Sequence, residues 1–261
     1  MAFIFCIANQ KGGVGKTTTA VNTAVALAKR RQKVLLVDLD AQGNATMGSG
    51  VEKGECSLTM YELLIGKAVF KDVVVRSEVG GYDILPANRE LSAAELDLMQ
   101  LKEPDRQLKK ILDDVSDQYD FILIDCPPSL SMITVNALCC AVGVIIPMQC
   151  EYFALEGLSD LVNTVKRVRH NKNQKLQVIG LLRVMYDARI TLQRQVSDQL
   201  KETFGDRVFD TVIPRNVRLA EAPSYGEPGI VYDKTSRGAK AYLSFGRELI
   251  KRVKEEFENK E

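Results

Sequence analysis

The segment that most constrains this chain is a glycine-rich stretch near its start, Lys11-Gly-Gly-Val-Gly-Lys-Thr17. It follows an apolar run at Phe3–Ala8, which predicts a β-strand, and it leads into a stretch of helical period from about Lys16 to Arg30. A glycine turn between a strand and a helix start directs backbone N–H groups, and the positive end of the helix dipole, into one loop. The pattern predicts a phosphate-binding loop.

The residue types in this loop indicate which phosphate ligand it takes. Its three glycines let the backbone approach phosphates without a Cβ clash. Lys16 suits the β- and γ-phosphates, the Thr17 hydroxyl suits Mg2+, and Thr18 is placed to donate to an α-phosphate. We therefore expect ATP and Mg2+ as cofactors, held by Lys11, Gly12, Gly13, Val14, Gly15, Lys16, Thr17 and Thr18.

Carboxylates follow two further apolar runs. Asp125 ends the run Asp120–Asp125, where a carboxylate suits the water shell of Mg2+, so Thr17 and Asp125 are the predicted metal residues. Asp38 and Asp40 follow the run Lys33–Asp38 and should lie on the same carboxyl edge of the sheet as the glycine loop. Asp40, further into its loop, is the better candidate for orienting an attacking water. The alternatives are a turn former for Asp125 and a solvated turn for Asp40.

The rest of the chain repeats the same alternation of short apolar runs and amphipathic helical stretches. Further strands are predicted at Tyr82–Leu85, Gly143–Pro147, Gln177–Leu182 and Val208–Ile213. Continuous apolar runs suit strands that are covered on both faces. The predicted fold is a doubly wound α/β structure, a mainly parallel sheet flanked by helices in three layers, with residues 1–261 as one domain.

Composition excludes several function classes. The chain has 35 Lys and Arg against 34 Asp and Glu, so a nucleic-acid or membrane site must be a local patch. Its six cysteines show no CxxC spacing, which indicates reduced thiols in a cytoplasmic protein rather than a metal site. No signal peptide is recognised, and the longest apolar runs fall far short of the ~20 residues that span a bilayer.

Several separated segments together resemble the deviant Walker A, or MinD/ParA, family of P-loop ATPases, and most closely its ParA/Soj branch. The loop has Gln10 where the general pattern has glycine, and Lys11 one residue later, as in that family. The matching segments, within residues 1 to about 250, are Asn9–Thr18, Val37–Thr46, Ile124–Ser129, Gln149–Tyr152 with Ala154–Leu158, and Val212–Leu219.

The resemblance implies roles for individual residues. Lys11 would touch the nucleotide of a partner subunit, so that a homodimer encloses two ATP molecules. Asp40 would be needed for hydrolysis and Asp125 would be the Walker B acid, which makes Asp40, Lys16 and Lys11 the expected catalytic set. Pro214 and Asn216 match the segment that holds the adenine.

The resemblance also implies partners. Arg189 and Arg218 match DNA-contacting arginines of the ParA/Soj branch, and Lys166, Arg167, Arg169, Lys172 and Lys175 form a second basic cluster. Non-specific DNA of the nucleoid and a ParB-type centromere-binding protein are the expected partners. No membrane partner is expected, because the tail at residues 251–261 ends in acidic residues. The alternatives are a nucleotide-switched regulator of replication initiation and a membrane-cycling ATPase of the MinD type.

Overall fold

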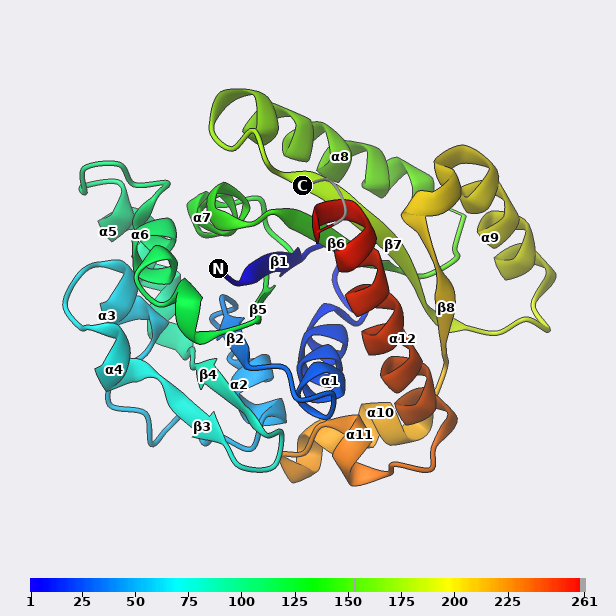
Figure 1. Ribbon diagram of the computed structural model, residues 1–261, viewed down its shortest axis with the longest axis horizontal. Helices are drawn as coiled ribbons and strands as arrows, with labels where there is room; N and C mark the ends of the chain where they lie inside the picture. Colours follow the sequence, from blue (N-terminus) through cyan, green and yellow to red (C-terminus); the bar gives the residue numbers. More distant parts are fainter. Residues whose placement is uncertain (153, 259–261) are drawn as a thin grey trace.

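The computed structural model describes residues 1–152 and 154–258. Residue 153 and residues 259–261, which end the expected domain and its tail, lie outside the described residues. The framework is one eight-stranded sheet (Figure 1). Its strands are β1 (Phe3–Ile7), β2 (Val34–Asp38), β3 (Val75–Ser77), β4 (Tyr82–Leu85), β5 (Phe121–Asp125), β6 (Gly143–Met148), β7 (Gln177–Tyr186) and β8 (Val208–Pro214).

The strand order is β3-β4-β2-β5-β1-β6-β7-β8, and every neighbouring pair is parallel except β3 with β4. The predicted doubly wound, mainly parallel sheet is therefore confirmed. β1, which leads into the glycine loop, lies between β5 and β6. This order brings the carboxyl ends of β1, β2 and β5 together, because parallel strands end at the same edge.

Two features of the sheet differ from the prediction. The antiparallel edge strand β3 was not predicted, since its three residues are too few to show a period. β7 runs on to Tyr186, beyond the predicted end at Leu182. The prediction stopped where the apolar run meets the charged residue Arg183, but Arg183 is buried inside the strand. The guanidinium of Arg183 donates to the Phe209 carbonyl oxygen (2.7 Å) and to the Ser197 hydroxyl (2.9 Å), which makes an arginine acceptable there.

Helices cover both faces of the sheet (Figure 1). They are α1 (Lys16–Ala28), α2 (Asn44–Gly48), α3 (Met60–Leu64), α4 (Phe70–Val73), α5 (Ala94–Leu98), α6 (Gln107–Asp113), α7 (Met132–Cys140), α8 (Ala154–Asn171), α9 (Thr191–Phe204), α10 (Val217–Glu221), α11 (Gly229–Tyr232) and α12 (Arg237–Val253). α1 and α12 pack side by side on one face, and α7 and α8 contribute to the core on the other. No helix among residues 1–152 and 154–258 is long and apolar enough to cross a membrane.

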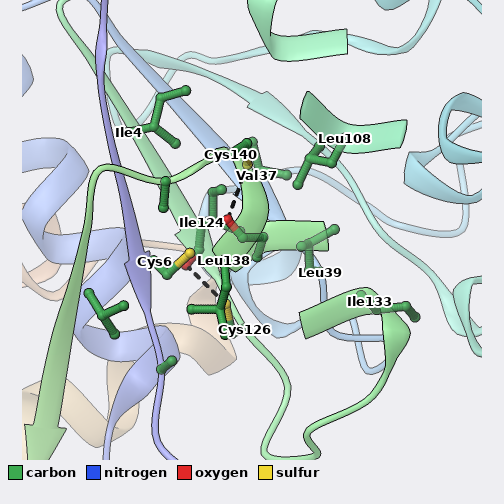
Figure 2. Close-up of a cluster of buried hydrophobic side chains, with 14 of the residues drawn as sticks. Ile4, Cys6, Val37, Leu39, Leu108, Ile124, Cys126, Ile133, Leu138 and Cys140 are labelled. Carbon is green, nitrogen blue, oxygen red and sulfur yellow. Dashed lines mark hydrogen bonds between the residues drawn. The ribbon is translucent and has the colours of Figure 1, made fainter. Parts of the chain in front are cut away.

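The strand β1 shows how the two cores are separated. Phe5 and Ile7 face the core beneath α1 and α12, and Ile4 and Cys6 face the opposite core. Figure 2 shows Cys6 beside Cys126 in that second core, and burial raises the pKa of the Cys6 thiol well above its usual range. All six cysteines are free and five of them are buried, which fits the expected structural thiols.

The contact between α1 and α12 depends on Gly246. A Cβ on this residue would lie 2.7 Å from the Cβ of Ala26, too close for two helices already in contact. We expect Gly246→Ala to lower the free energy of unfolding by about 1 kcal/mol, because overpacking outweighs the gain in helix propensity. Gly157→Ala in α8 is the matched control. Its Cβ would meet nothing within 4 Å, so urea denaturation should show a gain of about 0.5 kcal/mol.

Candidate functional site

The glycine loop between β1 and α1 has the backbone of an anion cradle. Gly13 and Gly15 have φ angles of 72° and 77°, in the left-handed region that glycine adopts without strain. Gly15, the N-cap residue of α1, has no side chain to accept hydrogen bonds from the first turn, so it leaves these N–H groups available to a ligand. The Lys16 ammonium, almost fully buried, donates to the Lys11 carbonyl oxygen (3.1 Å) across the same loop.

Neighbouring strands hold this loop in place. The Asn9 side-chain amide donates to the Pro147 carbonyl oxygen (2.8 Å) at the end of β6, and its oxygen accepts from the Lys11 N–H (3.0 Å). The Gln149 amide donates to the Gly13 carbonyl oxygen (3.2 Å). These bonds fix the loop before any ligand arrives, which lowers the entropic cost of binding.

Asp125 lies beside Lys16 at the end of β5 and is fully buried. Within the described part of the chain, neither of its carboxylate oxygens has a well-aligned hydrogen-bond donor. Burial, followed by the nearby Asp38 carboxylate, raises its pKa well above the usual range, although the Thr17 hydroxyl and Lys16 oppose this rise. A buried carboxylate without a partner is costly, and a cation would relieve that cost.

The chemistry of Thr17 and Asp125, the metal residues that the sequence predicts, is compatible with Mg2+. A hydroxyl and an adjacent carboxylate at the mouth of a phosphate loop are oxygen donors of the kind that Mg2+ prefers. The described residues contain no group of three or more His, Cys, Asp or Glu side chains that could hold a metal by themselves.

Asp38 and Asp40 take different positions after β2. Asp38 is fully buried and accepts from the Thr46 hydroxyl (2.7 Å), the Thr46 N–H (2.8 Å) and the Asp40 N–H (3.1 Å). Asp40 is only partly buried, accepts from the Gln42 N–H (3.0 Å), and acts electrostatically on Lys16. Asp38 therefore shapes the loop, and Asp40 is the carboxylate left near the phosphate site.

The sequence did not reveal that Asp38 shapes this loop. From its position after the apolar run, Asp38 was a second candidate, beside Asp40, for orienting the attacking water. The Thr46 hydroxyl also accepts from the Ala87 N–H (2.9 Å), which connects the loop to the segment after β4. Ala87 is 41 residues away from Thr46 along the chain, so only the structure reveals this connection. No local spacing could have shown it.

A buried carboxyl at this position predicts a pH dependence of stability. Burial raises the pKa of Asp38 from 3.8 to about 6, so the folded protein binds this proton more tightly than the unfolded chain does. Its contribution to stability therefore grows as the pH falls through 6 and is lost as the pH rises. We expect Asp38 to contribute about 1 kcal/mol to a gain in unfolding free energy of the metal-free protein between pH 7.5 and pH 5, and the raised pKa of Asp125 acts in the same direction.

Urea denaturation at the two pH values measures this gain. Asp187, whose pKa is lowered to about 2, should not change the unfolding free energy between pH 5 and pH 7.5, because it titrates below pH 4 in both the folded and the unfolded protein. An Asp38→Asn variant should show a weaker dependence. Equal unfolding free energies for the native sequence at both pH values would contradict the assignment.

Lys11, expected to reach a partner's nucleotide, is engaged with a carboxylate of its own chain. Its ammonium forms an ion pair with Glu151, and both side chains are about half exposed. An exposed ion pair of this kind contributes less than about 1 kcal/mol, so the lysine is easily released. Glu151 was not recognised as its partner in the sequence.

The residues expected to hold the adenine lie at the carboxyl end of β8. Pro214 lines a hollow of about 890 Å3 with Tyr186, whereas Thr17 and Thr18 line a separate hollow of about 420 Å3 with Asn22 and residues of α2, α10 and α11. Asn216 caps α10, its side-chain oxygen accepting from the Leu219 N–H (3.3 Å). Leu219, whose N–H binds the Asn216 side chain, lines the smaller hollow together with Thr17 and Thr18, so the segment that contains Asn216 borders the phosphate loop there.

Both arginines expected to contact DNA are exposed and paired with carboxylates. Arg189 forms a bidentate ion pair with Asp187, with distances of 2.9 Å and 2.6 Å. Arg218 pairs with Glu221 at 2.9 Å and lies 3.7 Å from Asp233. Arg189 lies between β7 and α9, and Arg218 lies in α10.

Comparison of the sequence with known proteins places this site in context. A family model described as an AAA domain matches residues 2–178. The chain is 49% identical to the sporulation initiation inhibitor protein Soj of Bacillus subtilis over 249 residues, which cover 95% of this chain and 98% of that protein. It is 45% identical to the chromosome partitioning protein ParA of Caulobacter vibrioides, covering 97% and 95% of the two chains.

Solved structures show the same fold. A Mycobacterium smegmatis protein described as cobyrinic acid a,c-diamide synthase, with bound ADP and magnesium, is 34% identical, with a TM-score of 0.85 over 97% of this chain and 96% of that one. A putative plasmid partition protein of Borrelia burgdorferi bound to AMPPNP is 27% identical, with a TM-score of 0.82 over 97% and 100% of the two chains. Nucleotide and magnesium binding therefore occur on this fold.

Proposed function

Because this chain belongs to the ParA/Soj family of partitioning ATPases, we propose that it is a DNA-partitioning ATPase whose Mg2+- and ATP-bound form is a sandwich dimer that holds non-specific DNA. Hydrolysis, stimulated by a ParB-type centromere-binding protein, separates the dimer and releases the DNA. The protein then acts in the cytoplasm on the nucleoid. Slow intrinsic turnover suits such a cycle, because the bound state lasts until the partner acts.

The observation that supports the proposal is the unequal placement of two lysines of the loop. The side chain of Lys16 is almost fully buried, whereas that of Lys11 is about half exposed and forms an ion pair with Glu151. An exposed lysine beside a phosphate site is available to a second copy of the chain across a two-fold axis. Nucleotide binding and dimerisation then become linked equilibria.

The proposed chemistry is positioning with charge stabilisation. Lys16, and Lys11 of the partner subunit, neutralise the oxygens of the transferred phosphoryl group, while Asp40 orients the attacking water. Mg2+ at Thr17 and Asp125 would supply further positive charge to the phosphates. Burial lowers the pKa of Lys16, and Asp125 and Asp40 oppose that change, so these carboxylates help keep the lysine charged.

Retention on plain duplex DNA tests the DNA part of the proposal. The native protein should bind with ATP and be released with ADP, and Arg189→Glu or Arg218→Glu should lower the affinity at least tenfold at moderate salt. Light scattering should show that both variants still dimerise with ATP, because neither residue lies in the nucleotide loop. Retention on anionic liposomes would instead favour the membrane-cycling alternative, and retention on neither surface would favour a regulator of other proteins.

A further inference from the structure

Met185, near the carboxyl end of β7, has a backbone conformation that its residue type avoids. Its φ angle is 50°, in the left-handed region. Among the described residues other than glycine, only Arg31 and Glu103 share a positive φ, and both lie in loops. The register of β7 with β8 also shifts on either side of Arg183, so the sheet is irregular here. Such a conformation costs free energy, and a contact elsewhere must compensate for it.

The left-handed conformation brings two successive side chains to one glycine of the phosphate loop. In a regular strand, neighbouring side chains point to opposite faces. Here a Cβ placed on Gly15 would lie 3.6 Å from the Met185 Cε and 4.0 Å from the Val184 Cγ2. Both distances are ordinary van der Waals contacts. The distorted end of β7 therefore packs against the loop at Gly15.

Met185 reaches a second glycine of the loop through Gln149. The Met185 sulfur accepts from the Gln149 side-chain amide (3.0 Å), and the same nitrogen donates to the Gly13 carbonyl oxygen (3.2 Å). An amide nitrogen carries two hydrogens, so both bonds can form at once. The thioether is thus the acceptor that holds the Gln149 amide in place beside Gly13.

The bond from Gln149 decides which way the peptide between Gly13 and Val14 faces. In a planar trans peptide, the carbonyl and the N–H point in opposite directions. Because Gln149 binds the Gly13 carbonyl oxygen, the Val14 N–H points away from Gln149, and in the described residues it has no backbone acceptor. Glycine allows such a peptide to turn over easily. An acceptor that fixes Gln149 therefore also fixes one donor of the expected anion cradle.

We propose that Met185 is a positioning residue for nucleotide binding. Its thioether holds Gln149, and Gln149 holds the peptide after Gly13 in the orientation that receives phosphate. This role rests on the ATP-binding part of the proposed function and extends it to two residues outside the glycine loop. The left-handed backbone of Met185 is compensated by the contacts that it makes with that loop.

Two substitutions at Met185 separate its acceptor from its bulk. Met185→Leu keeps an apolar side chain of similar volume but removes the acceptor. Met185→Asn places an amide oxygen as many bonds from the Cα as the sulfur, and asparagine tolerates the left-handed region. With a fluorescent ADP analogue and Mg2+ as the probe, Met185→Leu should weaken binding about fivefold, and Met185→Asn should stay within about twofold of the native protein. In steady-state turnover, the loss in Met185→Leu should appear in the KM for ATP rather than in kcat.

The loss should also depend on Gln149. Gln149→Ala should weaken binding of the same probe about fivefold to tenfold, and adding Met185→Leu to it should cause no further loss, because Met185 acts through Gln149. Met99→Leu, at a methionine of the loop after α5 that is 62% exposed, is the matched control and should bind the probe as the native protein does. Thermal unfolding of Met185→Leu should match that of the native protein, since Met185 is only partly buried and leucine has a similar volume.

The remaining outcomes contradict different statements. Native affinity in Met185→Leu, or losses that add in the double variant, would show that Met185 does not act through Gln149. A lower Tm in Met185→Leu, with binding that Met185→Asn does not restore, would assign Met185 to packing alone. If the native protein fails to bind the ADP analogue with Mg2+, the proposed function itself is wrong, whereas native binding with unaffected variants contradicts only the role of Met185.

Discussion

Asp40→Ala is expected to reduce ATP turnover by roughly 100-fold or more while leaving ATP binding and ATP-dependent dimerisation in place. Asp40 is partly exposed just after β2, and its carboxylate accepts from the Gln42 N–H and interacts with Lys16. Its removal takes away the group that orients water, but leaves every residue of the glycine loop. Steady-state phosphate release measures the loss, and equilibrium binding of an ATP analogue measures what remains.

Gln42→Ala is the matched control for this prediction. Gln42 is exposed in the same loop and contacts Asp40 through its backbone N–H. Alanine also has a backbone N–H, so the variant keeps this hydrogen bond. Its turnover should stay within about threefold of the native rate. Loss of nucleotide binding in Asp40→Ala, or equal losses in both variants, would mean that the substitution disrupts the loop and that Asp40 has no direct part in hydrolysis.

Asp125→Asn should act in opposite directions on stability and on activity. The native carboxylate is fully buried, lies beside Asp38, and lacks an aligned donor in the described residues. An amide of the same shape removes the buried charge, so the metal-free protein should gain on the order of 2 kcal/mol, or about 4 °C in Tm. Turnover with Mg2+ should fall by roughly 100-fold, since the water shell of the ion loses its acidic partner.

Differential scanning calorimetry without metal, together with phosphate release over a range of Mg2+ concentrations, distinguishes the two effects. Leu39→Ala serves as the control. Leu39 is a buried apolar residue directly after β2, and shortening its side chain should lower Tm because packing contacts are lost. A lower Tm for metal-free Asp125→Asn would contradict the claim that the buried charge is a cost. Native activity in that variant would exclude Asp125 from the metal site.

The sequence by itself determined the framework and the position of the phosphate loop. Lys11–Thr17 falls between a run of five apolar strand residues and a helix, and every apolar run predicted as a strand is one. These features are local, because strand period, glycine conformation and the start of a helix depend on residues within a few positions of one another. The convergence of Lys16, Asp40 and Asp125 also followed from sequence, since parallel strands share one carboxyl edge.

Only the tertiary structure decided which of these groups are paired. Asp38 binds Thr46 and so leaves Asp40 near the phosphate site, Asp125 has no aligned donor, and Lys11 pairs with a residue 140 positions away. The hollow of about 890 Å3 lined by Pro214 and Tyr186 likewise depends on residues of β7, β8 and α12 that packing brings together. The reason is physical: whether a charge is buried, paired or free depends on neighbours brought together by packing, and no spacing along the chain records them.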